Sequence, residues 1–129
     1  MKNYEDMSDF EINNLVAIAI GAKVTDSYKV GDERETIYYQ LGDEEFCVKH
    51  GYGSFVCQFA PCNNPADAWQ IISDNRISLI YGRSTEKGNE AQWCLASSPC
   101  DKHIVDYVSP SKILRAAMIV FLKMNEDKL

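Results

Sequence analysis

Two short segments of the chain place a histidine three residues after a cysteine. They hold the only two histidines of the sequence, and they read Cys47-Val48-Lys49-His50 and Cys100-Asp101-Lys102-His103. Thiolate and imidazole ligands suit tetrahedral zinc, so the four side chains could form a Cys2His2 site if the two segments met. Residues three apart on a strand point to opposite faces, so each pair would need a turn. The alternative is unrelated thiols and surface histidines, which we favour.

A third candidate is Cys62, which lies just before a predicted helix. A helix dipole lowers the pKa of a thiol at its N-terminus and raises the thiolate fraction. A nucleophilic cysteine also needs a positioned histidine and an oxyanion donor, and the sequence places neither His50 nor His103 beside it. We therefore favour a structural thiol and keep a nucleophile as the alternative.

Four polar residues are candidate binding residues. The side chains of Asn63, Asn64 and Asp67 surround the same helix start, where they could bind an anion or a polar ligand, or serve only as caps and turn formers. Arg115 lies between apolar neighbours near the C-terminus. We expect it to pair with Asp67 or Asp74 and hold two helices together.

The central helix has a clear start. Asn63 or Asn64 can cap it and Pro65 suits its first position, while Asn75-Arg76 should end it. One face of this helix is predicted to lie on the core through Trp69, and it consists of Ala68, Trp69 and Ile72. The apolar run 77–81 that follows predicts a buried strand.

Two further helices are predicted at the ends of the chain. Ser8 and Glu11 form a capping box before a helix over residues 9–20, which Gly21 should stop. Ser109 can cap a last helix that starts at Pro110 and is apolar over more than half its circumference. Strands are predicted over residues 23–30, 35–41, 44–49, 54–59, 91–96 and 104–108. These elements predict an α+β domain, with three helices packed on a mostly antiparallel sheet.

Composition limits the function classes. The 129 residues fit one domain, residues 1–129, of ordinary apolar content. Residues 1–45 hold 11 of the 19 acidic residues and four of the 13 basic ones, so we expect no nucleic-acid partner. The longest apolar runs are too short for a membrane, and the start lacks a secretory pattern, so we expect a cytoplasmic protein with its five cysteines as thiols. No phosphate-binding loop is present, and we expect no cofactor.

Four strings of the sequence resemble one family, the NinX-like proteins of lambdoid phages and enterobacterial prophages. They lie at residues 7–13, 61–69, 71–80 and 114–122, and they bracket nearly the whole chain. The resemblance implies a small phage or prophage protein in a bacterial cytoplasm. It implies no mechanism, because the family has no assigned biochemical function, and no catalytic residue is transferred.

The leading hypothesis is a non-enzymatic accessory protein that binds a host or phage protein. The binding surface would be the acidic hairpins of residues 31–45 or the exposed face around Asn63–Asp67. The alternative is a small metal- or thiol-dependent enzyme that uses the Cys/His pairs or Cys62. The oligomeric state is left open.

Overall fold

The structure, a computed structural model, describes residues 3–30, 34–50, 58–83 and 92–129. It confirms the predicted α+β class. Three α-helices and two three-stranded antiparallel sheets form in these residues. In chain order the elements are α1 (Asp9–Ala19), β1 (Lys23–Val30), β2 (Arg34–Leu41), β3 (Glu44–Lys49), α2 (Pro65–Asp74), β4 (Ser78–Arg83), β5 (Gln92–Ser97), β6 (Ile104–Val108) and α3 (Ile113–Met124).

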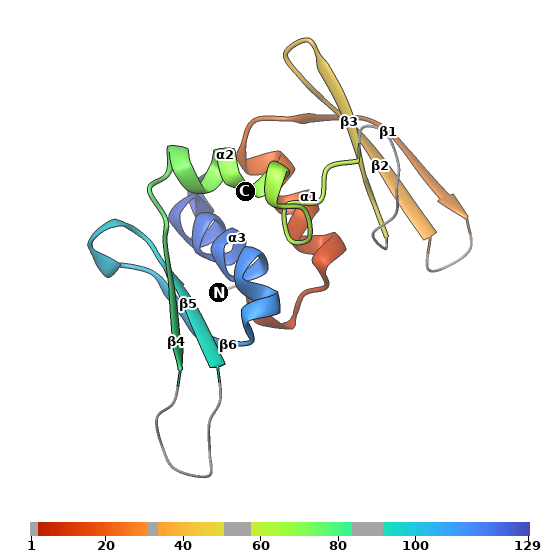
Figure 1. Cartoon of the computed structure of the whole chain (residues 1–129). Helices are drawn as coiled ribbons and strands as arrows, with labels where there is room; N and C mark the ends of the chain where they lie inside the picture. Colours follow the sequence, from red (N-terminus) through yellow and green to blue (C-terminus); the bar gives the residue numbers. More distant parts are fainter. Residues whose placement is uncertain (1–2, 31–33, 51–57, 84–91) are drawn as a thin grey trace.

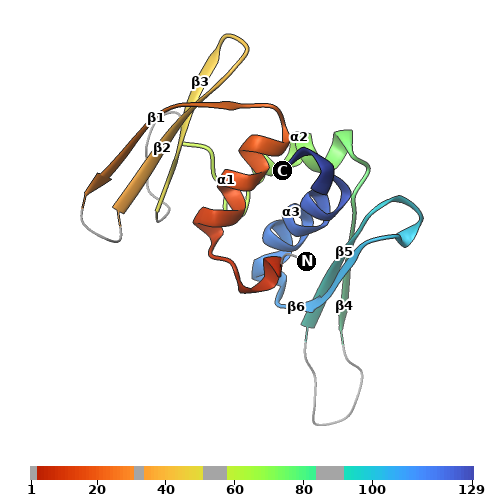
Figure 2. The same cartoon turned by 180° about the vertical axis from the view of Figure 1, so that it is seen from behind.

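The two sheets lie on opposite sides of the helices (Figures 1 and 2). One sheet has the order β1-β2-β3 and the other β4-β5-β6, so each is a meander of sequence neighbours. Antiparallel neighbours need only short connections, which explains why each sheet forms from one continuous part of the chain. The sheet β1-β2-β3 lies beside α1, whereas β4-β5-β6 lies beside α3.

Helix α3 forms the centre of the main core. It contacts α1, α2, β5 and β6. Its residues 116–122 are all buried, as the apolar pattern around most of its circumference predicts. A helix that is apolar on nearly all sides must be covered on several sides, and the neighbouring elements provide that cover.

A second, smaller core lies between α1 and the sheet β1-β2-β3. It consists of the buried residues Ala17, Ala22, Tyr39 and Val48, with partly buried aromatic and aliphatic side chains around them. Tyr39 is 1% exposed, and its hydroxyl donates a hydrogen bond of 2.6 Å to Oδ1 of Asn14 on α1. This bond satisfies two buried polar groups and joins the sheet to the helix.

The predicted start of the last helix is wrong, because α3 begins at Ile113 after a 3-10 turn at Pro110–Lys112, and the side chain of Ser109 forms no cap hydrogen bond. The predicted starts of α1 and α2 are confirmed. The N–H of Glu11 donates to Oγ of Ser8 at 3.2 Å, which is half of the capping box. Gly21 follows α1 with φ +101°, a conformation that glycine adopts at little cost. The cap of α2 is Asn64, whose Oδ1 accepts from the N–H of Ala66 at 3.0 Å.

The prediction that Trp69 lies in the core is wrong. Its side chain is 65% exposed, and α2 instead buries Ala68, Ile71 and Ile72. These residues have the spacing i, i+3 and i+4, which makes a single stripe, and Trp69 is displaced from it by about 100° around the axis.

Other predicted boundaries shift slightly. Strand β4 runs from Ser78 to Arg83, two residues further than predicted. The prediction that this strand is buried is wrong, because Ile80 is 47% exposed and Tyr81 is 61% exposed. The predicted strand 54–59 falls mostly outside the described residues, and Gln58 forms only an isolated parallel bridge with Cys47. The predicted loop at 82–89 also lies mostly outside them. In the described part of the chain, no helix is long and apolar enough to cross a membrane.

Candidate functional site

Arg115 on α3 holds the N-terminal segment of the chain against the helices. Its Nη1 donates to Oδ1 of Asp9 at 2.7 Å, and its Nη2 donates to backbone carbonyls of the segment before α1. Those carbonyls belong to Tyr4, Glu5 and Met7. The side chain of Arg115 is 15% exposed. A guanidinium group offers five N–H donors in a fixed plane. The guanidinium of Arg115 donates both to a carboxylate and to backbone carbonyls.

The predicted partners of Arg115 are therefore wrong. Asp67 accepts from the N–H of Ala60 at 2.9 Å, and Asp74 accepts from Nε2 of Gln70 at 2.7 Å. Both carboxylates lie on α2, but only Asp74 is bonded within the helix, while Asp67 is bonded to the loop before it. Arg115 does join two helices, as expected, but they are α3 and α1.

Asp9 extends this contact to the loop before α2. Its Oδ2 accepts from Nδ2 of Asn63 at 3.3 Å, while its Oδ1 accepts from Arg115. The side chains of Arg115, Asp9 and Asn63 thus form a continuous chain over three segments that are distant in sequence. Of the four predicted binding residues, the structure joins Asn63 and Arg115, whereas Asn64 and Asp67 have local structural bonds.

Two buried asparagines on α1 were not identified from the sequence. Asn13 is 3% exposed, and its Oδ1 accepts from the N–H of Cys62 at 3.0 Å. Asn14 accepts from Tyr39, and its Nδ2 donates to the carbonyl of Phe10 at 2.9 Å. The sequence did contain a signal, because Asn13 and Asn14 lie among the apolar residues of the predicted helix. Amide groups that are buried there need hydrogen-bond partners.

The environment of Cys62 raises the thiol pKa. Burial, with a smaller contribution from the charge of Asp9, raises the pKa of Cys62 to about 12, although Arg115 opposes the shift. The lowered pKa considered from the sequence is therefore wrong, because the thiol is buried and a buried thiolate loses its hydration. A neutral thiol is a weak nucleophile, so Cys62 has the properties of a core residue.

The structure does not bring the two Cys/His pairs together. Cys47 and His50 belong to the β1-β2-β3 side, and Cys100 and His103 to the short segment between β5 and β6. The ring of His50 stacks on Phe10 with centroids 3.7 Å apart. Among the described residues, no three histidine, cysteine or acidic side chains are grouped to hold a metal ion.

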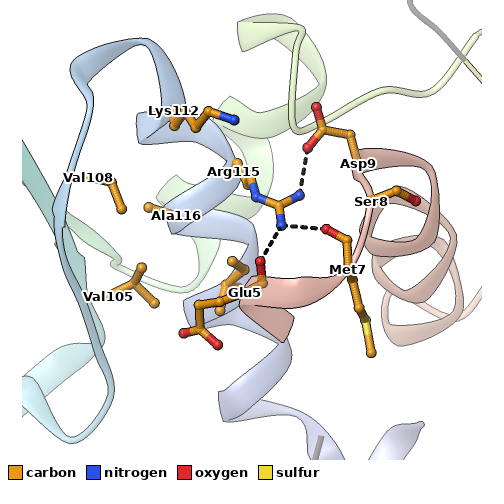
Figure 3. Close-up of a pocket in the computed structure, with 10 residues that line it drawn as sticks. Glu5, Met7, Ser8, Asp9, Val105, Val108, Lys112, Arg115 and Ala116 are labelled. Atoms are coloured by element: carbon orange, nitrogen blue, oxygen red, sulfur yellow. Dashed lines mark hydrogen bonds and ion pairs between the residues drawn. The ribbon is translucent and has the colours of Figure 1, made fainter. Parts of the chain in front are cut away.

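A pocket of about 480 Å³ opens beside Arg115. Figure 3 shows Val105 and Val108 of β6 on one side, and Met7, Ser8 and Asp9 on the other. Ala116 and Ile119 of α3 complete the apolar part of the lining, while Glu5, Lys112 and Arg115 contribute charged groups. A pocket of this volume, with apolar walls and a few polar groups, is typical of small-molecule sites.

A second pocket, of about 240 Å³, is also lined by Asp9. Its lining joins residues of α1, the end of β3 and the loop before α2: Ser8, Asp9, Phe10, Asn13, Lys49, His50, Gln58, Ala60 and Asn63. Ser8 and Asp9 therefore line both pockets.

One face of the sheet β1-β2-β3 exposes aromatic side chains. The register pairs Asp26 with Tyr38 and Tyr28 with Thr36, so these four share a face. Tyr28 is 63% exposed and Tyr38 is 42% exposed. The opposite face, which carries Tyr39, packs on α1.

Comparison with known proteins gives one family. The family model described as "Bacteriophage P22, NinX" matches residues 3–125. Searches of curated proteins and of solved structures gave no significant match.

Proposed function

The chain belongs to the bacteriophage P22 NinX family, and we propose that it is a non-enzymatic accessory protein that binds another protein, of the phage or of its host. The observation that carries the proposal is the exposed tyrosine face of the sheet β1-β2-β3. We name this surface the tyrosine face. The registers place on it Lys23, Asp26, Tyr28, Thr36, Tyr38, Gln40, Glu45, Lys49 and the buried Cys47.

The tyrosine face has the composition of a protein interface. Tyr28 and Tyr38 are both exposed, although tyrosine rings carry a large apolar surface. Tyrosine is enriched in interfaces because its ring supplies contact area with few rotatable bonds and its hydroxyl still forms hydrogen bonds. By contrast, Tyr39 lies on the opposite face of the sheet, where α1 covers it, and its side chain is 1% exposed.

Acidic residues accompany these tyrosines and indicate the charge of the partner. Asp26 and Glu45 lie on the tyrosine face, and Asp43 and Glu44 lie at the turn between β2 and β3. All four are exposed. Lys23 and Lys49 share the face, and the four acids still leave this surface with a net negative charge. Complementary charge steers association and sets specificity, so the partner should present lysine and arginine. Arginine also stacks well on tyrosine rings.

The other surface considered from the sequence, around Asn63–Asp67, is less well suited. Asn64 caps α2 and Asp67 binds the backbone of Ala60, so these polar groups are already bonded within the chain. Asn63 in turn donates to Asp9, so this side chain also has a partner within the chain.

Site-specific photo-crosslinking in the bacterial host tests the proposal. A photoreactive phenylalanine analogue replaces Tyr28 or Tyr38, and replaces the exposed Ser73 of α2 as the control position. We expect one discrete adduct with a basic protein from both tyrosine positions and none from Ser73. The same analogue at Asn63 examines the competing surface. An adduct from Asn63 with none from the sheet would refute the tyrosine face.

A charge-reversal pair tests the role of the acids. In the crosslinkable protein, Asp26→Lys with Glu45→Lys reverses two charges on the tyrosine face, and Asp106→Lys with Asp127→Lys reverses two exposed acids elsewhere. We expect the adduct to be lost with the first pair and retained with the second. Equal adduct yields from the two variants would show that charge on this face does not determine binding.

A further inference from the structure

The pocket beside Arg115 has a chemistry that the interaction proposal does not use. We propose that it binds a small amphipathic anion, a carboxylate on an aliphatic body. The apolar part would contact β6 and α3, and the carboxylate would lie at the mouth beside Lys112. The site is separate from the tyrosine face, and the proposal does not depend on that surface.

The apolar part of the lining comes from two elements that pack together. Val105 and Val108 of β6 line the pocket on one side, with Ala116 of α3 beside them (Figure 3). Ile119 of α3 also lines it. Val105, Ala116 and Ile119 are at most 5% exposed, so they belong to the main core as well as to the pocket. A wall fixed by the core keeps its shape before a ligand arrives, which lowers the entropy cost of binding.

The charges at the pocket favour an anion. Both acids already have cationic partners, because Asp9 accepts from Arg115 and Glu5 accepts from Lys123 at 3.3 Å. Lys112 is exposed, and among the described residues no carboxylate lies within ion-pair distance of its amine. Figure 3 shows its side chain on the same side of α3 as Arg115. An incoming carboxylate would therefore meet a cation without having to displace an existing pair.

Arg115 gives this part of the site its rigidity. Its guanidinium is fixed by Asp9 and by the carbonyls of Glu5 and Met7, so the segment that forms one wall cannot move away without breaking these bonds.

Octanoate is the probe. In a titration followed by nuclear magnetic resonance of the methyl groups, we expect saturable shifts of Val105, Val108 and Ile119. Lys112→Gln should weaken octanoate binding about tenfold, the loss of one charge-assisted hydrogen bond. The matched control is Lys102→Gln, an exposed lysine outside the pocket lining, which should leave the affinity unchanged.

Two further ligands separate charge from hydrophobicity. Octylamine has the same chain with the opposite charge, and 1-octanol has no charge, so both should bind more weakly than octanoate. Shifts at other methyl groups, equal affinities for octanoate and octylamine, or equal effects of the two lysine substitutions would overturn the proposal. These ligands do not involve the tyrosine face, so the outcome is independent of the crosslinking experiment.

Discussion

Arg115 shows how one side chain can organise a junction between distant segments. It donates to a carboxylate on α1 and to three carbonyls before α1, from a position on α3 that is mostly shielded from water. The sequence identified Arg115 as a structural cation between helices but not its partner. Spacing along one helix predicts which residues share a face, but the position of the N-terminal segment depends on the tertiary fold.

We expect Arg115→Met to lower the free energy of unfolding by about 2–4 kcal/mol, because it removes hydrogen bonds to carbonyls and leaves the partly buried Asp9 without its cation. Urea denaturation measures the loss. The control is Lys123→Met, which removes the more exposed pair with Glu5 and should cost about 1 kcal/mol or less. Equal losses would mean that the Arg115 bonds contribute little beyond surface charge.

The Cys62 thiol provides a prediction that depends on pH. Its pKa rises from 9.0 to about 12 in the folded protein, so near pH 8 it should react with a thiol reagent far more slowly than the exposed Cys100. Peptide mapping of labelled protein gives the two rates. Labelling of Cys62 as fast as Cys100 would contradict its burial.

The same pKa shift sets the sign of a stability change. Between about pH 9 and pH 12 the unfolded chain loses the Cys62 proton while the folded chain keeps it, so stability falls as the pH rises through this range. Below pH 9 the thiol is neutral in both states and has no such effect. Cys62→Ala should therefore reduce the loss of stability between pH 8 and pH 10.5, measured by urea denaturation at each pH.

At the scale of elements, local signals predicted the helices and strands well. Capping residues and turn formers act within a few residues, so Ser8, Gly21 and Pro65 indicated helix ends that the structure confirms. The face of α2 was harder to predict. Trp69 is the largest apolar residue of that helix, but the burial of Ala68 shows that a small side chain was needed there, because it lets α2 lie close to α3.

Strands β4 and β5 depend on a close fit between Gly82 and Trp93. The register places these residues opposite each other, and a Cβ atom on Gly82 would lie 2.1 Å from Cζ2 of Trp93. Gly82→Ala must therefore displace the indole ring, and we expect a loss of about 1–3 kcal/mol in unfolding free energy. The control Ser78→Ala, at an exposed position of the same strand, should be nearly neutral.

Fluorescence can follow the displaced ring directly. The chain has two tryptophans, so Trp69→Phe leaves Trp93 as the single fluorophore. Because Trp69 is exposed, this substitution should not disturb the core. In that background, Gly82→Ala should shift the emission of Trp93 to longer wavelength as the ring becomes more hydrated. An unchanged spectrum and unchanged stability together would show that the fit is not tight.

At the scale of the whole molecule, the sequence predicted the fold class but not the division into two sheets. Each sheet is a set of hairpins, and hairpin signals are local. Whether six strands form one sheet or two depends on which edges meet after the helices pack. Here α3 packs on β5 and β6, whereas α1 packs on β3. The pocket could not be predicted from the sequence either, because its lining comes from three segments that are distant in sequence, within residues 5–9, 105–108 and 112–119.

The two cores predict two levels of stability. Among the residues that the structure describes, four buried side chains form the core under β1-β2-β3, whereas the main core around α3 is several times larger. Small cooperative units open at lower free energy than the whole domain, so amides of β1-β2-β3 should exchange with deuterium before those of α3 and β5.

Val48→Ala should speed exchange in the sheet β1-β2-β3 alone, by lowering the free energy of its opening by about 1–2 kcal/mol. Met118→Ala, in the main core, should instead speed exchange in every element. Uniform exchange in the wild-type protein would show that the two sheets unfold as one unit.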